Sequence, residues 1–76
     1  MAFKFEIEKK IAPLSEPKAD GMQLEINRVS FNDRKAKIDI RPWDSTHEKM
    51  GKGIALTDDE AKVLRDKLLE EFPLEG

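Results

Sequence analysis

The stretch that decides the fold is KAKIDIRPWDSTHEKMGKGIALTDDE, which runs from Lys35 to Glu60. Its first part, Lys35–Arg41, alternates apolar and charged residues, as a strand with one buried face does. Pro42 cannot donate a hydrogen bond to a neighbouring strand, so we expect the regular pairing to fail there. A polar loop over Asp44–Lys52 then leads into Ile54-Ala55-Leu56, which predicts a short fourth strand.

A helix is predicted directly after this strand. Thr57 and Glu60 have the spacing of a capping box, in which each side chain bonds to the backbone of the other residue. Apolar residues then recur at spacings of three, four and four, as one face of a helix requires. These residues are Ala61, Leu64, Leu68 and Phe72. Pro73 marks the end of the helix.

The N-terminal half predicts two further strands. The first covers about residues 3–14, beyond which prolines interrupt the pattern. The second covers residues 22–32, but its apolar residues slip by one position midway, which predicts a bulge near Asn27-Arg28. With a hairpin turn at Asn32-Asp33-Arg34, the element order is β-β-β-β-α. We therefore expect an α+β fold with a curved antiparallel sheet and one C-terminal helix.

A single helix is too narrow to cover such a sheet. Four strands span roughly 19 Å at their usual spacing, whereas a helix with its side chains is about 10 Å wide. Val63, Leu69 and Phe72 widen the apolar surface of the helix beyond one stripe. We therefore expect a homodimer, with the helices of the two copies packed at the interface against a shared layer of sheet.

The composition indicates one small cytoplasmic domain over residues 1–76. A chain of 76 residues buries only about 60% of the surface that its unfolded form exposes. It has no cysteine, so a disulfide framework and a thiolate metal site are excluded. We find neither an apolar run long enough for a membrane helix nor a signal peptide at the charged N-terminus.

The charge is distributed unevenly along the chain. The net charge is −2, but residues 28–53 hold seven Lys/Arg and four Asp/Glu, net +3. Residues 54–76 hold three and seven, net −4. A local field matters more for binding than the total charge, so a basic middle segment is compatible with a nucleic-acid partner. The alternative explanation of this uneven charge distribution is chance, because 39% of the residues are charged.

The third strand carries the candidate binding residues. If its isoleucines face the helix, Lys37, Asp39 and Arg41 face the opposite way, and Trp43 follows this row approximately. Further cations flank the row, namely Arg28, Arg34, Lys35, Lys49 and Lys52. Cations follow phosphates and an exposed aromatic ring stacks on bases, so the pattern predicts binding of single-stranded nucleic acid. This prediction requires the indole and the cations to share a solvent-facing concave surface, opposite the acidic helix.

Each of these residues also has a purely structural interpretation. Trp43 could fill the end of the core or lie in the dimer interface. Taken alone, this packing role has at least as much support as base stacking. Phe31 fits the core or the hairpin edge better than a stacking position on periodicity alone. Lys37 and Arg41 fit an ordinary solvated surface, on which Asp39 would form an ion pair of about 0–1 kcal/mol.

The sequence offers no good case for an enzyme, a cofactor or a metal site. His47 is the only histidine, and Asp44 and Ser45 lie too close to it in the chain for a catalytic triad. Asp44 with Glu48 fits a solvated loop better than a metal site. Gly51-Lys52-Gly53 lacks the spacing of a phosphate-binding loop; its glycines fit either turn geometry or the close approach of a phosphate.

The stretch RVSFNDRKAKIDIRPWDSTHEKMGKGIALTDDE, Arg28–Glu60, resembles the positive cofactor four family of single-stranded-DNA-binding transcriptional coactivators, and most closely its YdbC-like bacterial branch. The motifs that carry the resemblance are Ile38–Arg41 followed by Trp43, then His47–Ile54, then the capped helix. Lys4–Ile7 also matches that branch. Their order and spacing are more specific than any one of them.

The resemblance implies a homodimer of β-β-β-β-α subunits in a bacterial cytoplasm that binds single-stranded DNA on curved sheet surfaces, largely without sequence preference. It also implies that Phe31, Lys37, Arg41, Trp43 and Lys52 sit where the family places binding aromatics and cations. Together with the flanking cations, the candidate nucleic-acid-binding residues are Lys4, Arg28, Phe31, Arg34, Lys37, Arg41, Trp43, Lys49 and Lys52.

The chain departs from the bacterial branch at several positions. That branch often has Trp where Phe31 stands and Gly where Asp33 stands, and it tends to have an aromatic residue and a lysine near Met22-Gln23. We therefore expect weaker binding than in its relatives. The alternative function is a protein-interaction module of the transcription machinery, acting through the acidic helix or the dimer surface. The sequence leaves the choice between DNA and RNA open.

Overall fold

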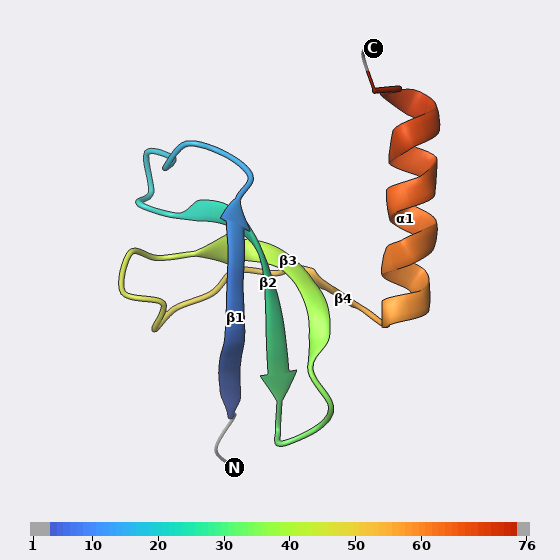
Figure 1. The fold of residues 1–76 in the computed structure, drawn as a ribbon. Coiled ribbons are helices and arrows are strands. Elements are labelled where there is room, and N and C mark those ends of the chain that lie inside the picture. The colour runs from blue at the N-terminus through green and yellow to red at the C-terminus, as the bar shows by residue number, and fades with distance from the viewer. Residues whose placement is uncertain (1–3, 75–76) are drawn as a thin grey trace.

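The computed structural model describes residues 4–74 and consists of a four-stranded antiparallel sheet followed by one helix (Figure 1). The strands lie in the sheet in the order in which they occur in the chain. They are β1 (Phe5–Pro13), β2 (Gln23–Phe31), β3 (Lys37–Trp43) and β4 (Ile54–Leu56), and the helix is α1 (Asp58–Glu71). The predicted β-β-β-β-α order is confirmed; Phe3, where the first strand was expected to begin, lies outside the described residues.

The bulges lie in β1 and not in β2. β2 pairs with β3 in unbroken register along its length, so the bulge predicted near Asn27-Arg28 is wrong. The register of β1 against β2 shifts twice instead, after Ile7 and after Lys10. The slip in the apolar pattern of β2 has another cause: this strand carries apolar residues on both faces of the sheet, which the assumption of one buried face misread.

Two faces of the sheet can be defined from the register. The inner face carries Glu25, Asn27 and Val29 of β2 opposite Arg41, Asp39 and Lys37 of β3. The helix face carries the alternating residues, chiefly Leu24, Ile26, Arg28, Ile38, Ile40 and Ile54. Lys37, Asp39 and Arg41 lie on the face opposite the isoleucines, as predicted. The prediction that this face meets solvent holds only for Lys37, because Asp39 is fully buried and the Arg41 side chain is 15% exposed.

The sheet is strongly coiled toward its inner face. Phe5 pairs with Phe31 at one end of β2, and Trp43 pairs with Gln23 at the other end. The rings of Phe5 and Trp43 nevertheless lie 5.2 Å apart, centroid to centroid. Strand twist and the bulges of β1, which add local twist, bring the two ends together, and the inner face becomes concave.

The core therefore lies on the opposite face from the one that the sequence predicts. The largest fully buried side chains among the described residues are Trp43, Val29, Asn27 and Asp39. The isoleucines that we expected to be buried are only half-buried on the helix face, and Ile54 is 55% exposed. Coiling has enclosed the inner face and left the convex apolar face uncovered.

Pro42 does not interrupt the pairing of β3, contrary to the prediction. The ladder with β2 continues through Pro42 to Trp43. The Pro42 carbonyl accepts a hydrogen bond from the Gly51 N–H at 2.9 Å, and in an antiparallel strand the N–H and C=O of one residue point the same way. The missing N–H of Pro42 therefore faces the loop, and no bond to β2 is lost.

The predicted hairpin turn between β2 and β3 is confirmed. Asn32 and Asp33 have φ angles of 53° and 61°, and the Arg34 N–H donates to the Phe31 carbonyl at 3.1 Å. Two successive positive φ angles define a type I′ turn, whose twist matches that of the flanking strands. Asn is among the residues that adopt this conformation most readily.

The capping box at the start of α1 is also confirmed. The Glu60 N–H donates to Thr57 Oγ1 at 3.2 Å, and the Thr57 N–H donates to Glu60 Oε1 at 2.8 Å. The bond from the Thr57 backbone lowers the pKa of Glu60 below its ordinary value. The described helix buries none of its residues, and Figure 1 shows it standing beside the sheet rather than lying across it.

We expect Thr57→Ala to lower the free energy of unfolding by about 1 kcal/mol, because the Glu60 N–H loses the Thr57 hydroxyl as its acceptor. Urea unfolding followed by circular dichroism at a fixed protein concentration measures the change. Thr57→Ser keeps the hydroxyl and is the matched control, expected to unfold close to the wild-type midpoint. Equal destabilisation by both substitutions would contradict the role of the cap.

Candidate nucleic-acid interface

The structure separates the predicted binding residues into three groups. Lys4, Arg28 and Arg41 form ion pairs with carboxylates. The other four predicted cations, Arg34, Lys37, Lys49 and Lys52, form no ion pair within residues 4–74, and all four are exposed. The two aromatic residues, Phe31 and Trp43, differ sharply in exposure.

Trp43 does not lie on a solvent-facing surface, which corrects the prediction. Its exposed fraction is 0%, because it lies on the enclosed inner face between Phe5 and His47. The His47 ring is 5.6 Å from the indole, centroid to centroid. In this conformation Trp43 closes one end of the core, as its structural interpretation proposed, and its ring is not accessible to a base.

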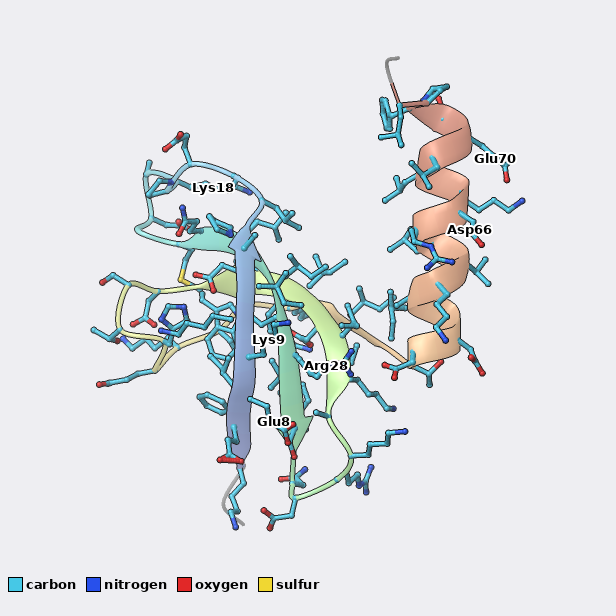
Figure 2. The ribbon with its side chains drawn as sticks, in the orientation of Figure 1. Glu8, Lys9, Lys18, Arg28, Asp66 and Glu70 are labelled. Carbon is cyan, nitrogen blue, oxygen red and sulfur yellow. The ribbon has the colours of Figure 1, made fainter. Side chains whose placement is uncertain are left out.

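Arg28 lies on the wrong face for the predicted interface. Its strand position is opposite Ile38 on the helix face, and Figure 2 shows it directed toward the base of the helix. Its Nη1 donates to Asp58 Oδ1 at 3.0 Å. This bond lowers the pKa of Asp58 below its ordinary value. Arg28 therefore links β2 to the first turn of α1, on the face opposite Lys37.

Three of the five N–H groups of the Arg41 guanidinium have partners within the protein. Nε and Nη2 each donate to a carboxylate oxygen of Asp39 at 2.6 Å, and Nη1 lies 3.4 Å from the sulfur of Met50. The Asp39 side chain is completely buried and that of Arg41 is 15% exposed. The carbon at the centre of the guanidinium lies 4.9 Å from the centroid of the Phe31 ring, within the range of a cation–π contact.

Phe31 is the more accessible of the two aromatic residues. It ends β2 at the edge of the inner face and is partly exposed. Lys37 begins β3 opposite Val29, two residues before Phe31 on the same face. Arg34 lies in the turn that directly follows Phe31. An aromatic ring and two cations that form no ion pair in the described chain thus lie at one end of the inner face.

The glycines beside Lys52 have a packing role. A Cβ on Gly51 would lie 2.6 Å from Cγ of Pro42, and a Cβ on Gly53 would collide with Cβ of Arg41 and the carbonyl of Ile40. The segment therefore passes so close to β3 that only glycine fits on either side of the lysine. Close packing against β3 is thus a reason for both glycines in addition to the two that the sequence suggested, and it fixes the exposed Lys52 beside the end of β3.

The loop before Lys52 is organised by Asp44. Its Oδ1 accepts hydrogen bonds from the backbone N–H groups of Glu48 and Lys49 at 2.9 and 3.0 Å, and its Oδ2 accepts one from the Thr46 hydroxyl. The bond from the Lys49 backbone is the main cause that lowers the pKa of Asp44. Asp44 therefore uses both carboxylate oxygens to order the loop.

The sequence reasoning missed a buried polar network on the inner face. His47 Nε2 lies 2.9 Å from each carboxylate oxygen of Glu25, and the Asn27 amide donates to the same carboxylate at 3.0 Å. Asn27 also accepts a bond from the Ile11 N–H, at the second bulge of β1. The sequence shows His47 only as a loop residue and does not indicate that Glu25 and Asn27 are enclosed; the coiling of the sheet brings the three side chains together in the core.

Lys4 lies at the open end of the β1–β2 hairpin. Its Nζ is 2.9 Å from Asp33 Oδ2, and both side chains are mostly exposed. An exposed pair of this kind contributes about 0–1 kcal/mol, so the pairing holds Lys4 only weakly.

Two comparisons with known proteins bear on this arrangement. The model of the family described as Transcriptional Coactivator p15 (PC4) matches residues 18–67, from the loop before β2 into α1. A protein of Treponema pallidum (strain Nichols), described only as uncharacterized, is 41% identical over 66 residues, which cover 87% of this chain and 76% of the relative. The matched residues include every predicted binding residue except Lys4. The resemblance found in the sequence is thereby confirmed.

We expect the emission of Trp43, the only tryptophan, to resist quenching by acrylamide, because the ring is fully enclosed. Stern–Volmer plots for the folded protein and for the protein in urea measure the difference, which should be several-fold. A free tryptophan amide is the reference for full exposure. Equal quenching in the folded and unfolded states would place the ring on the surface.

Proposed function

Because the chain belongs to the transcriptional coactivator p15 (PC4) family, we propose that it binds single-stranded DNA, largely without sequence preference, and acts in transcription regulation. That family is a nucleic-acid-binding and non-enzymatic one. We place the protein in the cytoplasm of a bacterial cell. Within residues 4–74 no helix is long and apolar enough to cross a membrane.

The observation that carries the proposal is the grouping of cations around Phe31. Arg34 lies in the turn that follows Phe31, and Lys37 lies opposite Val29 on the same face as Phe31; neither forms an ion pair within the described part of the chain. Cations that are not neutralised by a protein carboxylate can replace the counterions of a phosphate backbone. A partly exposed ring among them offers a surface to an unpaired base.

The charge of the helix favours a single strand over a duplex. Readers of duplex DNA commonly insert a helix into the major groove. The described helix α1 carries six acidic and three basic residues, net −3, and Figure 2 shows Asp66 and Glu70 on its side away from the sheet. A helix of this charge would be repelled by two rows of phosphates.

We also propose that the protein is a homodimer. An open groove of about 610 Å³ lies between the helix face and α1, lined by Ile26, Ile38, Ala61, Leu64, Arg65, Leu68, Leu69 and Phe72. Phe72 is 71% exposed and Val63 57% exposed, more apolar surface than a small monomer usually leaves in water. A second copy would fill the groove with the same apolar stripe, so each helix would cover part of both sheets.

A second candidate function is interaction with a protein of the transcription machinery. It is favoured by the acidic side of α1, on which Asp66 and Glu70 point away from the sheet (Figure 2). This surface would remain available in the proposed dimer, because the dimer uses the opposite side of the helix. The two functions are compatible in one molecule.

We expect a fluorescein-labelled oligo-dT to bind the protein with an affinity that falls with salt. The log–log slope should be about −0.7 for each phosphate contacted. Lys37→Ala and Lys52→Ala should each make the slope less steep by about that amount, because each removes one phosphate contact. Lys18→Ala, in the distant loop between β1 and β2 (Figure 2), is the matched control and should leave the slope unchanged.

Anisotropy titrations from 20 mM salt upward, repeated with a ribo-oligomer and a duplex, measure these slopes and the preference among nucleic acids. If neither anisotropy nor an electrophoretic mobility assay detects binding of oligo-dT at the lowest salt concentration, the proposed function is contradicted. In that case a pull-down that survives nuclease treatment would favour the protein-interaction alternative.

The dimer yields a separate prediction. Leu68→Glu should shift the sedimenting species from two chains toward one, because it places a carboxylate in the apolar groove where the second copy is proposed to pack. Lys67→Glu introduces the same residue at a neighbouring, mostly exposed position and should leave the mass unchanged. Sedimentation equilibrium at micromolar concentration measures the mass of the species in solution. A folded wild-type monomer at that concentration would contradict the proposed dimer.

A further inference from the structure

The planar guanidinium of Arg41 is held in one position on the inner face by Asp39 and Met50, which together are called the brace below. Its side chain lies against Asp39, whose carboxylate is completely buried and takes two parallel hydrogen bonds of 2.6 Å from the guanidinium. Met50 closes the remaining edge at Nη1. A bidentate bond of this kind fixes both the position and the plane of the guanidinium.

A guanidinium held in this way is a poor partner for a phosphate. Three of its five N–H groups are directed at Asp39 or Met50, and its charge is neutralised at short range by the buried carboxylate. Turning the paired N–H groups toward a phosphate would strip Asp39 of its partner inside the core, and an unpaired buried charge is strongly destabilising. Arg41 therefore differs from Lys37 and Lys52, whose exposed ammonium groups form no ion pair in the described chain.

The group that Arg41 contacts outside this brace is Phe31. Its central carbon lies 4.9 Å from the ring centroid, although Arg41 pairs in the sheet with Glu25, six residues before Phe31. The coiling of the sheet is what brings the two together. Gly53 supports the same arrangement, because any side chain there would collide with the stem of Arg41.

We infer that Asp39 and Arg41 are positioning residues that hold the Phe31 ring in a fixed orientation for stacking on a base, and that Arg41 does not itself contact a phosphate. This inference rests on the proposed binding of single-stranded DNA. Asp39 acts through Arg41 and Arg41 acts through the ring, so the three side chains form one unit. A ring that is already ordered loses less conformational entropy on binding.

The test is a double-mutant cycle measured with labelled oligo-dT. Phe31→Ala should weaken binding by roughly 5- to 150-fold, the range that corresponds to the loss of one base stack. Arg41→Lys keeps the positive charge but loses the bidentate bond and the flat contact. It should weaken binding severalfold and leave the salt slope at the wild-type value. In the Phe31→Ala background Arg41→Lys should cause no further loss beyond about twofold, because contacting residues that act as one unit are not additive.

Asp39→Asn is the second arm, and it should reproduce the effect of Arg41→Lys and its dependence on Phe31. The Trp43 emission and the thermal unfolding midpoint report whether either variant still folds. Arg41→Lys, which leaves the buried carboxylate with a cationic neighbour, keeps the test decisive if Asp39→Asn unfolds. Lys52→Ala combined with Phe31→Ala is the control pair. The losses of affinity from these two substitutions should be additive in free energy, and Lys52→Ala should also change the salt slope.

The outcomes separate the two proposals. If the wild-type protein binds oligo-dT, but Arg41→Ala lowers the salt slope while Arg41→Lys preserves affinity, then Arg41 is a phosphate contact and the positioning role is overturned. Additive losses from Arg41→Lys and Phe31→Ala would overturn it as well. In both cases the proposed function stands. Absence of wild-type binding overturns both proposals.

Discussion

The coiling of the sheet onto its inner face is the constraint on which the rest of the structure depends. It brings Phe5 from one end of the hairpin to within 5.2 Å of Trp43 at the other end of the ladder. Two bulges in β1 make this possible, because each lets the edge strand turn more sharply than a regular ladder allows. The enclosed side chains then become the core, whatever their polarity.

A core that contains Glu25, Asn27 and Asp39 must satisfy each polar group, since an unpaired one is costly to bury. Asp39 is satisfied by Arg41, and Glu25 by His47 and Asn27. These bonds tie β2, β3 and the loop after β3 into one unit, and specific polar contacts of this kind define an arrangement more uniquely than apolar packing does. The apolar helix face, by contrast, is left half-exposed, which is the physical basis for proposing a second copy against it.

The same coiling divides the basic residues by their roles. Arg41 lies inside the curve and is neutralised there, and Arg28 lies outside it and holds the helix through Asp58. Arg34, Lys37, Lys49 and Lys52 remain exposed around the rim and the loops. A row of cations in the sequence is therefore not equivalent to a row of phosphate contacts, because the carboxylate beside each one decides whether its charge is available.

The sequence by itself determined the elements: the strand order, the turn at Asn32-Asp33 and the helix capped by Thr57 follow from local chemistry, which acts over a few residues and survives in any fold. It also determined the family, through the order and spacing of motifs from Arg28 to Glu60. Only the tertiary structure decided which face of the sheet is enclosed. A period of two residues states that two faces differ, but not toward which of them the sheet will curl. The burial of Trp43, the pairing of Arg41 with Asp39 and the contact of Arg41 with Phe31 all depend on that direction, because they join residues that lie far apart along the ladder.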